Sequence, residues 1–302
     1  MQRLVELLRE AVGPEAVLEQ ESMKKHTTFR IGGPADIFAA PDTMQKAAQV
    51  IQICREQKVP FYVIGNGSNL LVSDKGYRGV VVQIYKNLSE IKVEGDVVTA
   101  QAGAMLSVIA KKALAASLTG FEFASGIPGT IGGASVMNAG AYGGEMRDVL
   151  QEVTVLTKDG HIRSVAAGEL KLGYRYSVIP ENEWIVLEAK LKLAHGDYDK
   201  IKSRMEELKE QRVSKQPLEL PSAGSTFKRP EGYFAGKLIM DTGLRGFSVG
   251  GAQVSEKHCG FVVNTGDATA ADVRGLISEV SKRVKEQFGV TLEPEVKMLG
   301  EF

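Results

Sequence analysis

The segment ASGIPGTIGGASVMNAGAYGGEMRDV, residues 124–149, constrains the fold of this chain more than any other. It holds seven glycines, yet almost no large charged side chain precedes Glu145. Ordering so many glycines costs much conformational entropy on folding. Flexible linkers of this glycine content are usually polar, whereas this segment carries Ile127, Ile131 and Tyr142. A backbone that approaches a flat or phosphorylated ligand explains the mixture better than a linker does.

A second glycine loop, GNGSNLLV, spans residues 65–72 after an apolar run that predicts a strand. Its G-x-G start suggests a dinucleotide fingerprint, but Leu70 occupies the third glycine position and no capped helix follows. No phosphate loop of the G-x-x-x-x-G-K-[ST] type occurs either. The loop is of the kind whose backbone N–H groups can form an anion nest, and a plain turn is the alternative.

Composition excludes several classes of protein. Lys plus Arg and Asp plus Glu both number 37 in 302 residues, so net charge indicates neither a nucleic-acid nor a membrane partner. Cys54 and Cys259 lie far apart without a CxxC or Cys/His cluster, which predicts a reducing compartment and no metal site. No apolar run approaches the roughly 18 residues of a membrane span. We therefore expect a soluble cytoplasmic protein.

Hydrophobic periodicity predicts an α+β fold. An amphipathic helix opens the chain, and Asp42 or Thr43 is expected to cap a second helix that runs to Lys58. The other elements that we expect are strands at 61–64, 79–85, 184–194, 260–264 and in the closing TLEPEVKMLG, hairpins within 91–103 and 152–165, and helices at 105–118, 198–211, before Gly243 and at 268–289. In the last helix Val273, Leu276, Ile277, Val280, Val284 and Phe288 form one apolar stripe.

The stretch PSAGSTFKRP, residues 221–230, combines two prolines, a glycine and three hydroxyl residues. Proline fixes φ and glycine permits unusual backbone conformations, so we expect a shaped loop that holds the hydroxyl of Ser225 in place. The alternative is a turn in which Ser222, Ser225 and Thr226 bond their own backbone.

Seven motifs follow one another along the chain over roughly residues 27 to 300. They are TTFRIGGPADIF, IGNGSNLLVSDKG, SGIPGTIGGASVMNAGAYGGE, GYRYS, PSAGSTFKRP, AGKLIMDTGLRGFSVGGAQVSEKHCGFVVN and LEPEVKMLG. Together they resemble the UDP-N-acetylenolpyruvoylglucosamine reductase family, in its shorter class. Each motif alone is weak, but the ordered set is highly specific.

The resemblance implies a two-part FAD-binding region of the vanillyl-alcohol-oxidase/PCMH type with a C-terminal α+β substrate-binding domain. We expect FAD-binding subdomains at 1–85 and at 86–196 plus 291–302, and the substrate-binding domain at 197–290. By the family's motifs, non-covalent FAD would contact Gly65, Asn66, Gly67, Ser68, Asn69, Ser125, Gly126, Gly129, Thr130, Gly132 and Gly133.

The resemblance also implies the reaction: NADPH reduces FAD, and the enolpyruvyl ether of UDP-N-acetylglucosamine then receives the hydride to give UDP-N-acetylmuramate, in peptidoglycan synthesis. Hydride addition places negative charge on the substrate carboxylate, so an electrophilic clamp and a proton donor are needed. The family's pattern assigns Arg175 and Glu295 to the clamp and Ser225 to the proton. Glu293, two residues from Glu295 and on the same face of a strand, is the residue to which this role could most easily be assigned by mistake.

Other assignments stay open at this point. Lys228 and Arg229 could meet the UDP diphosphate or simply face solvent. His258 and Cys259 are interpreted as a core imidazole and an inert buried thiol. The alternative functions are a flavin oxidase on the same scaffold, reoxidised by O₂, and a non-catalytic flavin- or nucleotide-sugar-binding protein.

Overall fold

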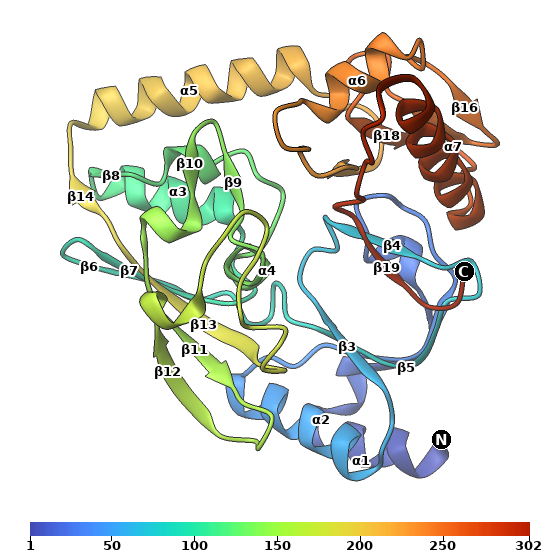
Figure 1. Cartoon of the computed structure of the whole chain (residues 1–302). Coiled ribbons are helices and arrows are strands. Elements are labelled where there is room, and N and C mark those ends of the chain that lie inside the picture. Colours follow the sequence, from blue (N-terminus) through green and yellow to red (C-terminus); the bar gives the residue numbers. More distant parts are fainter. The chain divides into compact units, whose positions relative to one another are not determined.

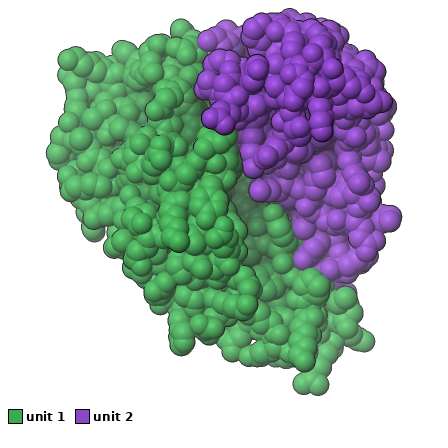
Figure 2. Space-filling model, in the orientation of Figure 1, with its two compact units in different colours: residues 1–18, 37–66, 80–212 green, residues 19–36, 67–79, 213–302 purple.

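The computed structural model describes all 302 residues, which form two compact units (Figure 2). Unit 1 comprises residues 1–18, 37–66 and 80–212, and unit 2 comprises residues 19–36, 67–79 and 213–302. Strands β1 (Val17–Ser22), β2 (Pro34–Ala39) and β5 (Tyr77–Gln83) contain residues of both units. They join β3 (Phe61–Ile64) in a four-stranded sheet of order β1-β2-β5-β3.

Unit 1 is built around an antiparallel sheet of order β12-β11-β13-β7-β6 (Figure 1). Its strands are β6 (Ile91–Glu94), β7 (Val97–Gln101), β11 (Leu150–Leu156), β12 (Ile162–Ala166) and β13 (Ile185–Lys192). Both predicted hairpins are confirmed. They turn at Gly95 and Gly160, where φ is 60° and 85°, conformations that glycine adopts without strain. Short pairs join β8 (Leu118–Thr119) to β14 (Ala194–His195) and β9 (Gly140–Ala141) to β10 (Gly144–Glu145).

Unit 1 contains five α-helices, all of which were expected except the one inside the glycine-rich segment. They are α1 (Gln2–Val12), α2 (Met44–Glu56), α3 (Leu106–Ala115), α4 (Ile131–Val136) and α5 (Tyr198–Lys215), the last of which ends in unit 2. Thr43 caps α2 as expected, since its hydroxyl accepts from the Lys46 N–H at 3.1 Å. The helices α3 and α4 pack on the five-stranded sheet. The predicted helix 105–118 was too long, because Ser117 takes a left-handed φ of 54° and the chain enters β8.

Unit 2 contains the antiparallel sheet β15-β18-β17-β16 with α7 packed against it. Its elements are β4 (Leu70–Val72), β15 (Ser222–Ser225), α6 (Ala235–Asp241), β16 (Ser248–Val249), β17 (Ala252–Val254), β18 (Phe261–Asn264), α7 (Ala270–Phe288) and β19 (Lys297–Leu299). The apolar stripe of α7 is buried as predicted up to Val284. Phe288 is the exception: it lies in the last turn and is 36% exposed.

The C-terminal strand is shorter than predicted, and β19 pairs in parallel with β4. The N–H of Ser73 donates to the Leu299 carbonyl at 2.8 Å, which extends this pairing. The strand therefore pairs with residues 70–72, which belong to unit 2. The family resemblance groups residues 291–302 with residues 86–196. The three-part division of the chain at residues 85 and 196 stays a prediction. No helix combines the length and the apolar character needed to cross a membrane.

Candidate active site

The two glycine loops of the sequence meet within unit 1. Asn66, just after β3, donates from Nδ2 to the Pro128 carbonyl at 2.7 Å. Gly65 faces Thr130 so closely that a Cβ at position 65 would lie 2.3 Å from the Thr130 Oγ1. Only glycine fits at this contact, which explains why the sequence has none of the larger residues there.

The second loop is held by hydrogen bonds to the segment that follows β7. The Gly132 N–H donates to the Ala102 carbonyl at 2.9 Å, and a Cβ on Gly132 would lie 2.8 Å from the Ala102 Cβ. The Leu106 N–H donates to the Gly129 carbonyl at 3.1 Å. Gly126 and Gly133 are exposed. The loop thus combines a fixed backbone with positions that carry no side chain, which fits a flat group laid against it.

The rest of the first loop belongs to unit 2. Gly67 has a φ of 61°, and a Cβ there would lie 2.1 Å from the His26 carbonyl oxygen. Ser68 is partly buried. Asn69 donates from Nδ2 to the Glu295 carbonyl at 3.2 Å, and its own carbonyl accepts from the Lys297 N–H at 3.0 Å. Asn69 therefore holds the chain segment that carries Glu295.

Ser225 lies at the end of β15, so the predicted loop begins as a strand. The pairing with β18 shifts register between Ser222 and Ser225, where Gly224 has a φ of 75°, which is the geometry of a bulge. Ser225 is exposed, whereas the next residue, Thr226, is buried. A bulge redirects a side chain, so the hydroxyl of Ser225 faces outward from a fixed strand.

Thr226 fixes this position with three hydrogen bonds to two neighbouring segments. Its N–H donates to the Gly260 carbonyl at 2.8 Å, and its Oγ1 accepts from the Val262 N–H at 2.9 Å. Its carbonyl accepts from the Glu295 N–H at 2.8 Å. The structure therefore brings the backbones of Ser225 and Glu295 into hydrogen-bonded neighbouring segments, a relation that no local pattern of the sequence showed.

The two candidate glutamates have different surroundings. Glu293 is exposed and pairs with Lys228, at 3.1 Å between Oε2 and Nζ, and the two backbones are joined as well. Glu295 is partly buried. Arg229 stacks its guanidinium over Phe234, 4.0 Å from the ring centre. Lys228 and Glu293 thus form an exposed ion pair. Glu295 is the glutamate whose backbone N–H bonds to Thr226, the residue after Ser225.

Arg175 occupies the tip of a tight turn in unit 1. Gly173 and Tyr176 exchange backbone hydrogen bonds at 3.0 and 3.2 Å, which leaves Tyr174 and Arg175 at the tip. Arg175 has a φ of 55°, an uncommon conformation for a residue with a side chain. Its guanidinium donates to the Gly140 carbonyl at 3.4 Å and lies over Tyr174, 5.0 Å from the ring centre.

The histidine and the cysteine of the SEKHCGFVVN stretch, His258 and Cys259, are packed and not reactive. His258 accepts from the Gly260 N–H through Nδ1 at 3.1 Å, and burial lowers the pKa of its imidazole. Burial likewise raises the pKa of the Cys259 thiol. Neither contributes a charged group at neutral pH.

Sequence reasoning missed one cation beside the glycine loop. Arg212, on α5, lies so close to Gly126 that a Cβ there would be 2.8 Å from its Nη1. Burial lowers the pKa of the Arg212 guanidinium. In the sequence it is one of many charges on a solvated helix, so no pattern could have singled it out.

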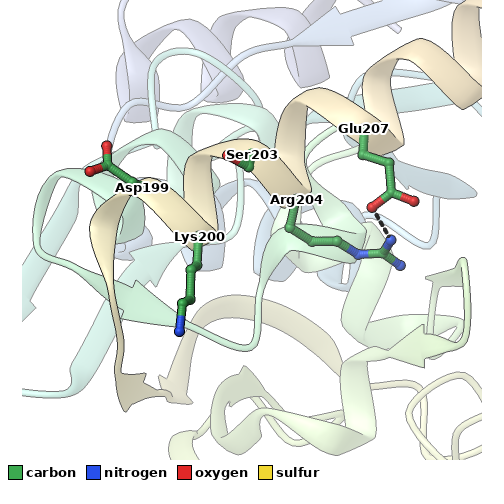
Figure 3. Close-up of a pocket in the computed structure, with 5 residues that line it drawn as sticks. All are labelled: Asp199, Lys200, Ser203, Arg204 and Glu207. Carbon is green, nitrogen blue, oxygen red and sulfur yellow. Dashed lines mark hydrogen bonds and ion pairs between the residues drawn. The ribbon is translucent and has the colours of Figure 1, made fainter.

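One surface hollow lies away from the predicted site residues. It has a volume of about 420 Å³ and lies along one face of α5, lined by Asp199, Lys200, Ser203, Arg204 and Glu207 (Figure 3). Arg204 and Glu207 form an ion pair at 2.5 Å across it. None of the predicted site residues contributes, and all the lining groups are those of an ordinary solvated helix face.

Comparison with known proteins identifies the class first. Residues 35–166 match the family model of an FAD binding domain, so the chain is a flavoprotein of the FAD-binding fold. A solved glucose oxidase variant of Phl p 4 shares that fold at a TM-score of 0.51 and 15% identity, over 65% of this chain and 44% of the other. Residues 216–299 match the C-terminal domain of UDP-N-acetylenolpyruvoylglucosamine reductase. The predicted fold class is confirmed.

Whole-chain relatives specify the family. The reductase of this name from Agathobacter rectalis is 59% identical, over 100% of this chain and 99% of the relative, and that from Caldanaerobacter subterraneus subsp. tengcongensis is 55% identical, over 99% and 98%. The crystal structure of the reductase from Thermus caldophilus matches at a TM-score of 0.80 and 37% identity, over 93% and 98%. The chain belongs to the UDP-N-acetylenolpyruvoylglucosamine reductase family and is an FAD-dependent oxidoreductase.

Replacing Gly65 by alanine is expected to weaken FAD binding roughly ten- to a hundredfold, because the added methyl group displaces Thr130, and overpacking of this kind costs about 1–3 kcal/mol. Titration of the flavin-free protein with FAD, followed by flavin fluorescence, measures the change. Gly168→Ala is the matched control, since a Cβ there meets nothing within 4 Å. Equal FAD affinity in both variants would contradict the predicted contact of FAD with Gly65.

Proposed function

We propose that this chain reduces UDP-N-acetylglucosamine enolpyruvate to UDP-N-acetylmuramate with NADPH as the reductant, in peptidoglycan precursor synthesis. Relatives with the reductase's name align over the whole chain, which supports the proposal. The structural observation that carries it is the hydrogen-bonded placement of the Ser225 strand beside the Glu295 segment. FAD, when bound, would supply the hydride-transfer chemistry between NADPH and the sugar.

The reaction needs two hydrogens at two different carbons. The hydride bonds to the terminal vinyl carbon, and the π electrons of the double bond move toward the carboxylate to give an enediolate. Ser225 then donates its proton to the carbon beside the carboxylate. A serine hydroxyl is a weak acid, but the carbanion-like carbon is a strong base, so alignment of the hydroxyl matters more than its acidity. The fixed bulge of β15 supplies that alignment.

Arg175 and Glu295 act on the carboxylate in this proposal. A planar guanidinium can grip both carboxylate oxygens and stabilise the charge that develops on them. Glu295 helps beside a carboxylate when it is protonated or shares a proton. Lys228 and Arg229 remain our candidates for contacts with the diphosphate of the substrate. Lys228 would first have to break its ion pair with Glu293.

We further propose that the reaction takes place in the cytoplasm. Cys54 and Cys259 are both free and buried, which is the usual state of cysteine in a reducing compartment. Neither the even charge balance nor the fold favours a nucleic-acid or membrane partner.

The test of this proposal is the stoichiometry of NADPH consumption. With limiting enolpyruvyl sugar under nitrogen, we expect one NADPH oxidised per sugar and a product heavier than the substrate by two hydrogens, seen by mass spectrometry. Equally fast NADPH oxidation in air without the sugar would instead identify a flavin oxidase. A protein that binds FAD and the sugar but oxidises no NADPH would support the non-catalytic alternative.

A further inference from the structure

Asn138 is a fully buried polar residue at the end of α4, 0% exposed, in the glycine-rich segment. Its φ is 45°, a left-handed conformation that asparagine tolerates better than most residues. A buried amide carries two donors and an acceptor, each of which needs a partner. Here all of them have one, and the partners belong to two different segments.

The amide joins the β9–β10 hairpin region to the Arg175 turn. Nδ2 donates to the Gly173 carbonyl at 2.9 Å and to Oε2 of Glu145 at 2.9 Å. Oδ1 accepts from the Arg147 N–H at 2.9 Å. The Gly173 carbonyl is the one that also accepts from the Tyr176 N–H to close the turn, so Asn138 contacts the turn at its base.

Arg175 takes an uncommon backbone conformation at the tip of a turn that the hydrogen bonds between Gly173 and Tyr176 close. It is a non-glycine residue at positive φ, and the tip of a two-residue turn can rearrange unless neighbouring structure fixes it. Ser177 adds a second bond on the other side, from Oγ to the Val136 carbonyl at 2.5 Å. Asn138 thus bonds to one side of the turn, and Asn138 itself follows α4 and the glycine loop in the chain.

We propose that Asn138 is a positioning residue, which fixes the 173–176 turn to the FAD-binding glycine segment and so directs the Arg175 guanidinium at the substrate carboxylate. This inference rests on the proposed function, in which Arg175 is the clamp. A misplacement of about 1 Å at a reacting group can slow catalysis by about a hundredfold. Loss of the Asn138 amide therefore predicts a defect confined to the step that uses Arg175.

The test is a double-mutant cycle in the flavin half-reactions, measured by stopped flow under nitrogen. Asn138→Gly keeps the positive φ and removes the amide. We expect NADPH to reduce its flavin within about twofold of the wild-type rate, while the enolpyruvyl sugar reoxidises it about 10- to 100-fold more slowly. In an Arg175→Ala background the same change should have an effect of less than about threefold. Should the glycine variant not fold, Asn138→Asp keeps the shape and the acceptor for Arg147 and serves in its place.

Thr157→Val is the matched control for a lost buried hydrogen bond. Thr157 is buried, and its hydroxyl accepts from the His161 N–H at 3.1 Å in the β11–β12 turn. The Thr157→Val variant should carry out both half-reactions at the wild-type rates. Equal slowing by Asn138→Gly in both backgrounds, or equal slowing of both half-reactions, would show a general structural role and overturn the inference. Normal reoxidation of Arg175→Ala alone would instead remove the clamp from the proposed function.

Discussion

Replacement of Ser225 by alanine is expected to slow reoxidation of the flavin by the enolpyruvyl sugar by about 10²- to 10⁴-fold, the usual range for loss of a general acid. FAD binding and the reduction of the flavin by NADPH should stay unchanged. The reason is that the hydroxyl is exposed at the end of β15 and Thr226 holds the backbone, so the strand does not depend on the side chain of Ser225. Anaerobic stopped-flow absorbance separates the two half-reactions.

Ser222→Ala is the control for the Ser225 variant, since it makes the same change at the other serine of β15. It should reoxidise at the wild-type rate. Reoxidation of Ser225→Ala at the wild-type rate would exclude Ser225 as the proton donor and leave that role to another group.

The Arg175→Ala variant is the second large effect that we expect, a loss of about 10²- to 10³-fold in the same half-reaction, typical for removal of one group that stabilises developing charge. Arg175→Lys should recover only part of this loss, because a point charge cannot match the planar fork of the guanidinium on a carboxylate. The rate of reoxidation against sugar concentration gives both the limiting rate and the apparent affinity.

Arg163→Ala is the matched control for Arg175. Arg163 is another arginine of unit 1 that stacks on an aromatic ring, with its guanidinium 4.9 Å from the centre of the Trp184 ring. Its loss should leave the reoxidation rate unchanged. Equal rates in Arg175→Ala and Arg163→Ala would remove Arg175 from the clamp.

Local patterns predicted the elements that local forces determine. Residues close in sequence determine the apolar stripe of α7 and the two glycine-turned hairpins, and their spacing predicted both. For the cap of α2 the sequence left two candidates, Asp42 and Thr43, of which Thr43 is the cap. The end of α3 was not, because the left-handed Ser117 that ends it carries no sequence signal comparable to a glycine.

Long-range relations could not be predicted in this way. The pairing of β19 with β4 joins residues about two hundred positions apart, and the contact between Asn69 and the Glu295 segment follows from that pairing. The nearness of Ser225 to Glu295 was available only through resemblance to the family. Asn138 gave no signal either, since its partners are backbone groups and a side chain that only the fold brings to it.

The central claim is that one flavin site accepts electrons from NADPH and passes them to an enolpyruvyl sugar. The visible absorption of the purified protein under nitrogen tests it most directly, first alone, then with one equivalent of NADPH, and then with the sugar. We predict an oxidised flavin spectrum that bleaches with NADPH and returns with the sugar. Bleaching that the sugar does not reverse, or a colourless protein that takes up no added FAD, would contradict this account.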